Sequence, residues 1–275
     1  MFNQQFLTAI QAALKAGAAI SQIYHKHNYT ITRKADQSPV TEADMESHRI
    51  IIQKLASTQL PVLSEEGEAN LWNQIHQTNR YWMIDPLDGT QEFINQNGEF
   101  TVNIALIENK KPIWGIIYIP EQRQLYAGIK ESGAWQWEDI DNHHLTIQAL
   151  QQKAITLPKR EADNEYRIVG SKSHKTQTTD AFIARISEVI NEIKIIRAGS
   201  SLKFCHIASG EADLYPRMDN IMEWDVAAGQ AIIEAAGGQL KRWPDGGSIL
   251  YNSRNMRYPT FLALAPGRTD TLFFK

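Results

Sequence analysis

The sequence predicts a two-part fold, with an α+β layer over residues 1–150 and an α/β domain over residues 151–275. In the first half, helical patterns come before a run of strand patterns that lies between Tyr81 and Gly133, an order typical of α+β structure. In the second half, strand and helix patterns alternate from Tyr166 to Ala265, which is typical of an α/β sheet. We therefore expect two layered halves with a cleft between them.

Two amphipathic helices are predicted at the start of the chain. The first has an apolar stripe at alternating steps of four and three residues, from Phe6 to Tyr24. The second begins at Thr41-Glu42-Ala43-Asp44, which has the pattern of a capping box. We expect the second helix to turn four apolar residues inward: Met45, Ile51, Ile52 and Leu55.

A series of strands follows the two helices. A short strand at 60–63 comes before four β-rich runs, which are separated by turn residues such as Asp85-Pro86 and Asn97-Gly98. The runs cover residues 81–84, 100–108, 113–119 and 124–129. The stretch 141–164 is polar and contains Pro158, so we place the junction between the halves there.

The second half is predicted to contain strands and helices in alternation. The strands cover residues 166–170, 194–197, 212–215 and 261–265, and the helices cover 180–193, 201–208 and 225–236. Gly237-Gly238 closes the last helix. The inward face of helix 180–193 is expected to consist of Phe182, Ile186, Val189 and Ile193.

Composition and charge exclude several classes of protein. The chain has 275 residues, 43% of them hydrophobic, and its 28 basic and 31 acidic residues give a net charge of −3. This balance offers no electrostatic surface for a nucleic acid polymer or for anionic lipid. The single cysteine, Cys205, excludes an intrachain disulfide and a cysteine-rich zinc site, and we expect it to pack in the core. The patterns predict a cytoplasmic protein without a membrane span or a secretory signal.

Asp85-Pro86-Leu87-Asp88-Gly89-Thr90 is the most informative motif, because it directly follows a predicted strand. Two carboxylates in a stiff turn can bind one or two hard divalent cations, and oxygen-only ligands favour Mg²⁺ or Mn²⁺ over zinc. The amides of Gly89 and Thr90 open a predicted helix, where a phosphate can bind. The alternative is an ordinary turn, since Asp-Pro and Asp-Gly are common turn dipeptides.

Two further acidic positions strengthen the metal hypothesis. Glu65 follows another strand, and Asp225 opens a helix. Their alternatives are an exposed loop pair for Glu65-Glu66 and, for Asp225, a carboxylate that stabilises the helix dipole. If both converge with Asp85 and Asp88, they form a site suited to two-metal hydrolysis.

Together these motifs resemble those of the lithium-sensitive inositol monophosphatase superfamily, and the similarity extends from Val40 to Gly238. It rests on Ser64-Glu65-Glu66, residues 85–90 and Trp224-Asp225-Val226-Ala227-Ala228. Within the superfamily the chain resembles the CysQ-type 3'(2'),5'-bisphosphate nucleotidases. That likeness comes from Gln91-Glu92-Phe93, residues 199–205 and 214–217, and residues 170–174, where Lys172 replaces a common arginine.

The resemblance implies a layered αβαβα sandwich of the sugar-phosphatase type and a site for two or three Mg²⁺ ions. The metal ligands it implies are Glu65, Asp85, the carbonyl of Leu87, Asp88 and Asp225. It also implies catalytic roles for Asp44, Glu65 and Thr90, with the attacking water near Glu65 and Thr90 and a hydrogen bond from Thr90 to Asp44. Asp44 can combine this role with its capping role only if its helix N-terminus faces the cleft.

Substrate contacts are expected from both halves. Arg217 falls where inositol phosphatases tend to have an acidic residue, and an arginine there suits a second phosphate. A surface ion pair is the alternative for Arg217, and a solvated loop position is the alternative for His174. The full expected set is Leu87, Asp88, Gly89, Thr90, Ser171, Ser173, His174, Gly199, Ser200, Lys203, Arg217 and Asp225.

The function implied by the resemblance is Mg²⁺-dependent removal of the 3'-phosphate from adenosine 3',5'-bisphosphate, and also from 3'-phosphoadenylyl sulfate, in sulfate assimilation. The partner would be this small nucleotide. The alternatives are an inositol monophosphatase, a fructose-1,6-bisphosphatase or an inactive metal- and nucleotide-binding module. A homodimer and peripheral attachment to the cytoplasmic face of the inner membrane are left open.

Overall fold

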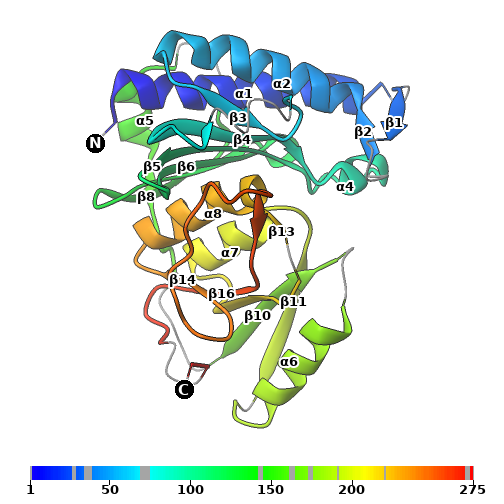
Figure 1. Ribbon diagram of the computed structural model, residues 1–275, viewed down its shortest axis with the longest axis vertical. Coiled ribbons are helices and arrows are strands. Elements are labelled where there is room, and N and C mark those ends of the chain that lie inside the picture. The colour runs from blue at the N-terminus through cyan, green and yellow to red at the C-terminus, as the bar shows by residue number, and fades with distance from the viewer. Residues whose placement is uncertain are drawn as a thin grey trace.

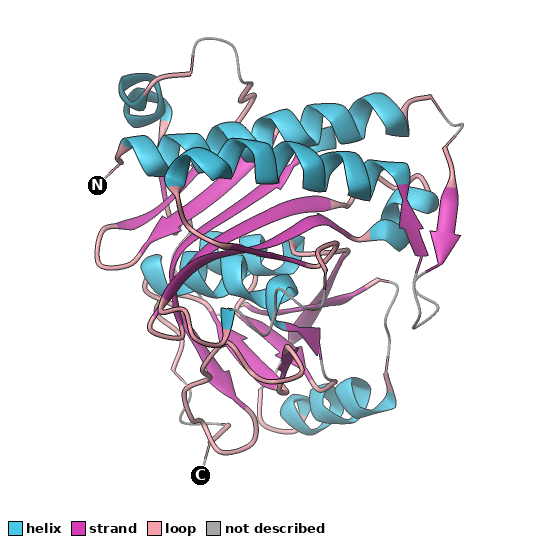
Figure 2. Ribbon diagram, turned by 45° about the horizontal axis from the view of Figure 1, so that its top comes forward, coloured by secondary structure: helices cyan, strands magenta, loops and turns pink. Residues whose placement is uncertain are grey.

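The computed structural model describes residues 2–26, 29–33, 39–68, 75–141, 145–160, 165–172, 176–190, 192–219, 221–269 and 273–274. These residues form five layers, which Figure 1 shows from top to bottom. Helices α1 (Gln4–Tyr24) and α2 (Glu42–Leu55) form the first layer, helices α7 (Leu202–Ser209) and α8 (Glu223–Ala235) the third, and α6 (Gln177–Ser187) the fifth. The second and fourth layers are β-sheets (Figure 2). The predicted αβαβα sandwich is confirmed.

The upper sheet has seven strands that run in chain order. All neighbouring strands are antiparallel except for β3 and β4, which are parallel. The strands are β3 (Val62–Ser64), β4 (Arg80–Asp88), β5 (Thr101–Glu108), β6 (Lys111–Ile119), β7 (Gln124–Ile129), β8 (Gly133–Trp137) and β9 (Ile155–Thr156).

The lower sheet has five strands in the order β11-β10-β12-β16-β14. Its first three strands are parallel, and β16 is antiparallel to both of its neighbours. The strands are β10 (Tyr166–Ser171), β11 (Ile193–Ala198), β12 (Leu214–Arg217), β14 (Gln239–Arg242) and β16 (Phe261–Leu264).

Short elements connect these layers. Strands β1 (Ile31–Arg33) and β2 (Pro39–Thr41) form one antiparallel pair, and β13 (Ile221–Met222) and β15 (Arg257–Tyr258) form another. The short helices are α4 (Thr90–Ile94), α5 (Ile147–Lys153), η1 (Ala56–Thr58) and η2 (Pro120–Gln122).

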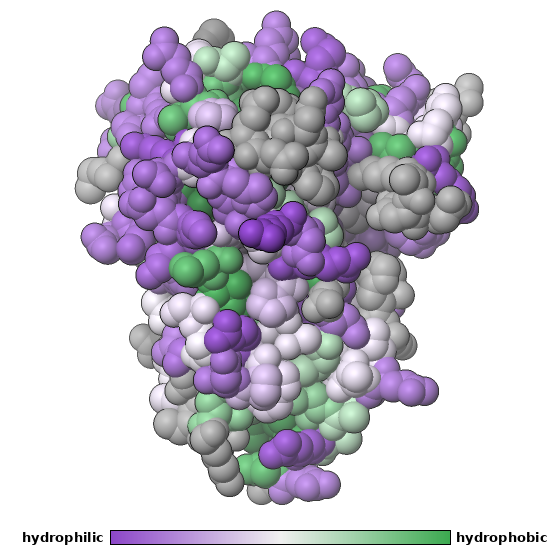
Figure 3. Space-filling model, in the orientation of Figure 1, coloured by the Kyte–Doolittle hydropathy of each residue, from purple (hydrophilic) through white to green (hydrophobic). Residues whose placement is uncertain are grey.

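Strand alternation divides the core on the two faces of the upper sheet. In β5, Ile104 and Leu106 pack with α1 and α2, whereas Ala105 and Ile107 pack with α7 and α8. A third apolar cluster lies between the lower sheet and α6, with Phe182 and Ile186 facing Ile168. On the face in Figure 3, hydrophilic residues predominate over the upper half, whereas the lower half also shows residues of intermediate and hydrophobic character.

Glycines allow α8 to lie directly on the upper sheet. A Cβ added at Gly115 of β6 would lie 2.1 Å from the backbone oxygen of Ala228, and one at Gly128 of β7 would lie 2.6 Å from the Cα of Ile232. Both neighbours are backbone atoms, so neither contact can be relieved by a side-chain rotation. This close approach places the N-terminus of α8, with Asp225, near the C-terminal end of β4 and the start of β5.

We expect the Gly115→Ala variant to lose about 3 kcal/mol of unfolding free energy, at the upper end of the usual cost of overpacking, because the helix must move off the sheet. Urea unfolding should measure this loss. Lys111→Ala is the control on the same strand, and as an exposed substitution it should change stability by less than about 0.5 kcal/mol. A Gly115→Ala protein with wild-type stability would contradict the close packing of α8.

Two predicted inward faces are wrong in part. The inward face of α2 includes the buried residues Ala43, Ser47, Ile50 and Ile51. Met45 lies about 200° around the helix from Ala43, so it points away from this face and is 49% exposed. Val189 is 67% exposed, because α6 ends at Ser187. Ile193 was expected on that helix but opens β11, where it pairs with Tyr166.

The predicted junction contains regular structure among its described residues. Helix α5 begins at Ile147, and β9 pairs with β8, so the upper sheet extends to Thr156. The division of the chain at residue 150 into two domains stays a prediction. The expected burial of Cys205 is confirmed at 3% exposure.

Among the described residues, α1 has the length and apolar composition that a membrane span requires. It lies near the N-terminus, and 56% of its most apolar window is buried inside the structure. Packing of α1 against α2 and the upper sheet accounts for this composition. The absence of a membrane span stays a prediction.

Candidate active site

A β-bulge brings the two aspartates of the central motif to the same face of the sheet. Asp85 pairs with Asn103 and Asp88 with Thr101, so three steps along β4 match two steps along β5. Without the extra residue, side chains three positions apart would point to opposite faces. Pro86 lies inside the bulge, where its missing N–H breaks no ladder hydrogen bond.

Hydrogen bonds hold the bulge in place. The Leu87 amide donates to Asp85 Oδ1 at 3.1 Å, and Ser47 Oγ of α2 donates to the carbonyl of Pro86 at 2.6 Å. The Leu87 side chain is 2% exposed and packs in the core under α1 and α2. The aspartates therefore lie on a rigid segment rather than on a free loop.

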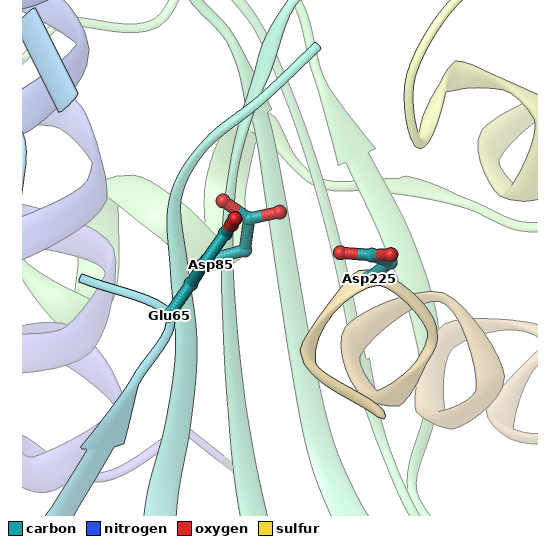
Figure 4. Close-up of side chains that lie close together, drawn as sticks. All are labelled: Glu65, Asp85 and Asp225. Carbon is teal, nitrogen blue, oxygen red and sulfur yellow. The ribbon is translucent and has the colours of Figure 1, made fainter. Parts of the chain in front are cut away.

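Glu65 and Asp225 converge with Asp85 from two other elements. Glu65 follows β3, and its amide donates to the carbonyl of Ile84 at 3.2 Å. Asp225 lies in the first turn of α8, where its Oδ2 accepts from the Met222 amide at 3.1 Å. One oxygen from each of the three carboxylates lies within 4.8 Å of the others, and Figure 4 shows the three side chains pointing toward one another.

This carboxylate cluster, which comprises Glu65, Asp85 and Asp225, is electrostatically unfavourable by itself. Burial, followed by the charges of Glu65, Asp88 and Asp225, raises the pKa of Asp85 well above its ordinary value. Burial, followed by Asp88 and Glu65, does the same for the pKa of Asp225. Like charges held this close need a counter-charge, and a donor set made only of carboxylate oxygens suits a hard divalent cation. The residues present therefore fit the expected metal.

Asp88 lies beside the carboxylate cluster but is held by the second half of the chain. Its Oδ2 accepts hydrogen bonds from Ser200 Oγ at 2.7 Å and from Ser201 Oγ at 2.5 Å. Its distance to the other carboxylates is short enough to raise their pKa values. The upper sheet and the start of α7 are thus joined at this residue.

Asp44 makes both of the expected hydrogen-bond contacts, to Thr41 and to Thr90, because it uses a different oxygen for each. Its Oδ2 accepts from the amide of Thr41 at 2.7 Å and from the Thr41 hydroxyl at 2.6 Å, which is the capping role. Its Oδ1 accepts from Thr90 Oγ1 at 3.0 Å. Burial raises the pKa of Asp44 against the opposing effect of these hydrogen bonds. The N-terminus of α2 therefore reaches the same region as α4.

A cavity of about 290 Å³ lies between the two halves. Of the expected substrate contacts, Ser171, Ser200, Lys203 and Arg217 line it, opposite Asp88, Gly89 and Thr90. Gly199 is buried behind the lining, and its amide donates to Glu99 Oε2 at 2.8 Å. Ser173 and His174 lie outside the described residues.

The cavity has an acidic wall and a basic wall. The carboxylates come from the upper sheet and α8, whereas Lys203 and Arg217 come from α7 and β12. Burial lowers the pKa of Lys203 to about 8, although the charges of Asp88, Glu92 and Glu99 oppose this shift. Within the described residues, Arg217 Nε is buried without a hydrogen-bond partner. A bound anion could contact metal ions held by the acidic wall and, on its other side, the positive charges of Lys203 and Arg217 at the basic wall.

The profile of the inositol monophosphatase family matches residues 3–270. This chain belongs to the inositol monophosphatase family.

Relatives within this family are similar over most of their length. The CysQ 3'(2'),5'-bisphosphate nucleotidase of Buchnera aphidicola is 39% identical, with 88% of this chain and 85% of that protein covered. CysQ of Escherichia coli K12 is also 39% identical, with coverage of 85% and 88%. The crystal structure of CysQ from Bacteroides thetaiotaomicron has a TM-score of 0.85 at 38% identity and covers 95% of this chain and 97% of that chain.

Three buried polar residues at the site of this family member were missed by sequence reasoning. Thr101, Asn103 and Ser201 are each at most 1% exposed, and all lie next to Asp88. A signal was available in β5, where Thr101 and Asn103 are polar, lie on the same face and precede the apolar run 104–107. Ser201 was hidden because it reads as the start of a helix.

Proposed function

We propose that this protein is a Mg²⁺-dependent 3'(2'),5'-bisphosphate nucleotidase that removes the 3'-phosphate of adenosine 3',5'-bisphosphate and of 3'-phosphoadenylyl sulfate. The observation that carries the proposal is the 38–39% identity, over most of both chains, to relatives with this activity in their names. The two-sided charge of the cavity supports it, because the substrate has a phosphate at each end of its ribose.

Five groups would hold two or three Mg²⁺ ions: Glu65, Asp85, the carbonyl of Leu87, Asp88 and Asp225. Bound there, the ions would neutralise the phosphoryl oxygens and lower the pKa of a water. The raised pKa values of Asp85 and Asp225 support this assignment, because a bound cation would offset the burial and the like charges that raise them.

Thr90 and Asp44 would orient the attacking water. The single hydroxyl hydrogen of Thr90 is donated to Asp44, which leaves the lone pairs of Thr90 to accept a hydrogen bond from that water. Asp44 is buried and has a raised pKa, and both properties favour its accepting a proton. Glu65 would lie on the other side of the water, as a second acceptor.

The second half would select the substrate. Arg217 and Lys203 would bind the phosphate that is not cleaved, and Ser171 and Ser200 would contact the nucleoside. An inositol monophosphate has no second phosphate for Arg217. The inositol monophosphatase and fructose-1,6-bisphosphatase alternatives would use the same carboxylates and differ at this wall.

The physiological setting belongs to the same proposal. We place the reaction in sulfate assimilation and the protein in the cytoplasm, with the small nucleotide as its partner. A homodimer and peripheral attachment to the inner membrane are compatible with the proposal but not required by it.

The decisive test compares phosphate release from adenosine 3',5'-bisphosphate and from inositol 1-phosphate, each with Mg²⁺ and with or without lithium. We expect the nucleotide to have the higher kcat/KM and lithium to inhibit its hydrolysis. Preference for inositol 1-phosphate would refute the nucleotidase assignment while leaving the metal site in place. Tight nucleotide binding without turnover would favour the inactive binding module.

A further inference from the structure

We propose that Asn103 is a positioning residue that sets the orientation of the Asp88 carboxylate through the hydroxyl of Ser201. This inference rests on the proposed metal site. It concerns a residue that lies behind the cavity lining and that would contact neither metal nor substrate.

The proposed chain of contacts is short and buried. Asn103 Nδ2 donates to Ser201 Oγ at 2.8 Å, and Ser201 Oγ donates to Asp88 Oδ2 at 2.5 Å. The same Nδ2 lies 3.4 Å from Asp88 Oδ2, too far for a strong direct bond. Asn103 and Ser201 are each 1% exposed, so in the folded protein their polar groups are shielded from bulk water.

Thr101 determines which way the amide of Asn103 points. Its hydroxyl donates to Asn103 Oδ1 at 3.0 Å, which leaves the amide nitrogen to face Ser201. Thr101 Oγ1 also lies 2.8 Å from Ser200 Oγ, the other hydroxyl bonded to Asp88. One face of β5 therefore contacts both serines that hold Asp88, and it reaches Ser201 through the hydrogen bond from Asn103.

Ser201 needs this support because it has two acceptors for one hydrogen. Its hydroxyl can donate to Asp88 Oδ2 or to the backbone carbonyl of Asp225, which lies 3.3 Å away. The amide of Asn103 occupies a lone pair of Ser201 Oγ and so fixes the hydrogen toward Asp88. With Oδ2 held by both serines, the carboxylate of Asp88 presents Oδ1 to the cavity in a single orientation. Partners behind a metal ligand typically change metal affinity or activity by about 10–100-fold.

The experiment measures the Kd of Mn²⁺ by calorimetry, without substrate, for Asn103→Ala, Thr101→Val and Thr101→Ser. We expect Asn103→Ala to raise the Kd about 10–100-fold. Thr101→Val should also raise the Mn²⁺ Kd. Thr101→Ser keeps the hydroxyl and should have the wild-type Kd. Gln136→Ala removes a similarly buried amide from β8 of the same sheet and should leave the Kd unchanged.

A purely structural role for Asn103 predicts something different. It would lower thermal stability in EDTA but leave the Mn²⁺ Kd at the wild-type value, and that result would overturn the proposal. If Asn103→Ala does not fold, the two Thr101 variants test the proposal instead. Equal Mn²⁺ Kd values for Thr101→Val and Thr101→Ser would then overturn it. Mn²⁺ binding by a wild-type protein that releases no phosphate from the nucleotide would refute the proposed function alone.

Discussion

Replacing Asp85 by asparagine is expected to lower kcat for 3'-phosphate release roughly 1,000-fold while making the metal-free protein more stable. The loss of activity corresponds to about 4 kcal/mol, the several kcal/mol by which metal ions stabilise charge in the transition state. The gain in stability comes from the carboxylate cluster, where burial and the negative charges of neighbouring carboxylates disfavour the ionised form of Asp85 and raise its pKa. An amide of the same shape removes that repulsion.

The gain in stability should depend on pH with a definite sign. The pKa of Asp85 is higher in the folded than in the unfolded chain, so folding takes up a proton there. No penalty is present below the unfolded pKa of about 4, and the penalty grows as pH rises toward the folded value. In EDTA, the Tm difference between Asp85→Asn and wild type should therefore widen between pH 4 and pH 8.

Thermal unfolding with and without Mg²⁺, together with phosphate release, checks both parts of this prediction. Mg²⁺ should raise the Tm of the wild type more than that of the variant. Asp245→Asn is the matched control, because Asp245 is exposed and Arg242 holds its pKa at about 2, so this variant should keep wild-type turnover. Asp85→Asn with full activity would remove Asp85 from the ligand set.

Arg217→Glu is expected to lower kcat/KM for adenosine 3',5'-bisphosphate about 100-fold, equivalent to about 3 kcal/mol for a lost buried charge pair. Arg217 is half-buried at the basic wall, and its Nε has no hydrogen-bond partner among the described residues. A bound phosphate would supply that partner. A glutamate would place a second negative charge against the uncleaved phosphate.

Adenosine 3'-monophosphate separates this effect from general damage, since it keeps the base and the cleaved phosphate but lacks the second one. We expect its kcat/KM to change less than threefold in Arg217→Glu. Arg185→Glu, on the exposed face of α6, makes the same charge change far from the cavity and should alter neither substrate. Equal losses on both substrates would show that Arg217 does not select for the second phosphate.

Much of the fold was predictable because its signals are local. The stripe from Phe6 to Tyr24 has the period of one helix, and the capping pattern at Thr41 correctly begins α2. The helical and strand patterns indicated an α+β half followed by an α/β half, whereas the αβαβα order of the layers was implied by the resemblance to the inositol monophosphatase superfamily. The errors at Met45 and Val189 arose because an apolar residue was assumed to face inward, although its angular position on the helix, or the point where the helix ends, decides its exposure.

Residue types and local patterns were enough to identify the residues that are chemically equipped for the site: the acidic residues after β3, in the last part of β4 and at the start of α8, and the arginine and lysine of the second half. Their arrangement and hydrogen-bond partners depend on contacts between elements that are far apart in the chain. The bulge between Asp85 and Asp88 depends on pairing with β5, and the division of the two Asp44 oxygens depends on Thr90, 46 residues away in the chain. The support of Asp88 by Ser201 joins residues 113 apart. Such contacts have no local pattern, because they exist only when separate layers pack close enough for hydrogen bonds to form.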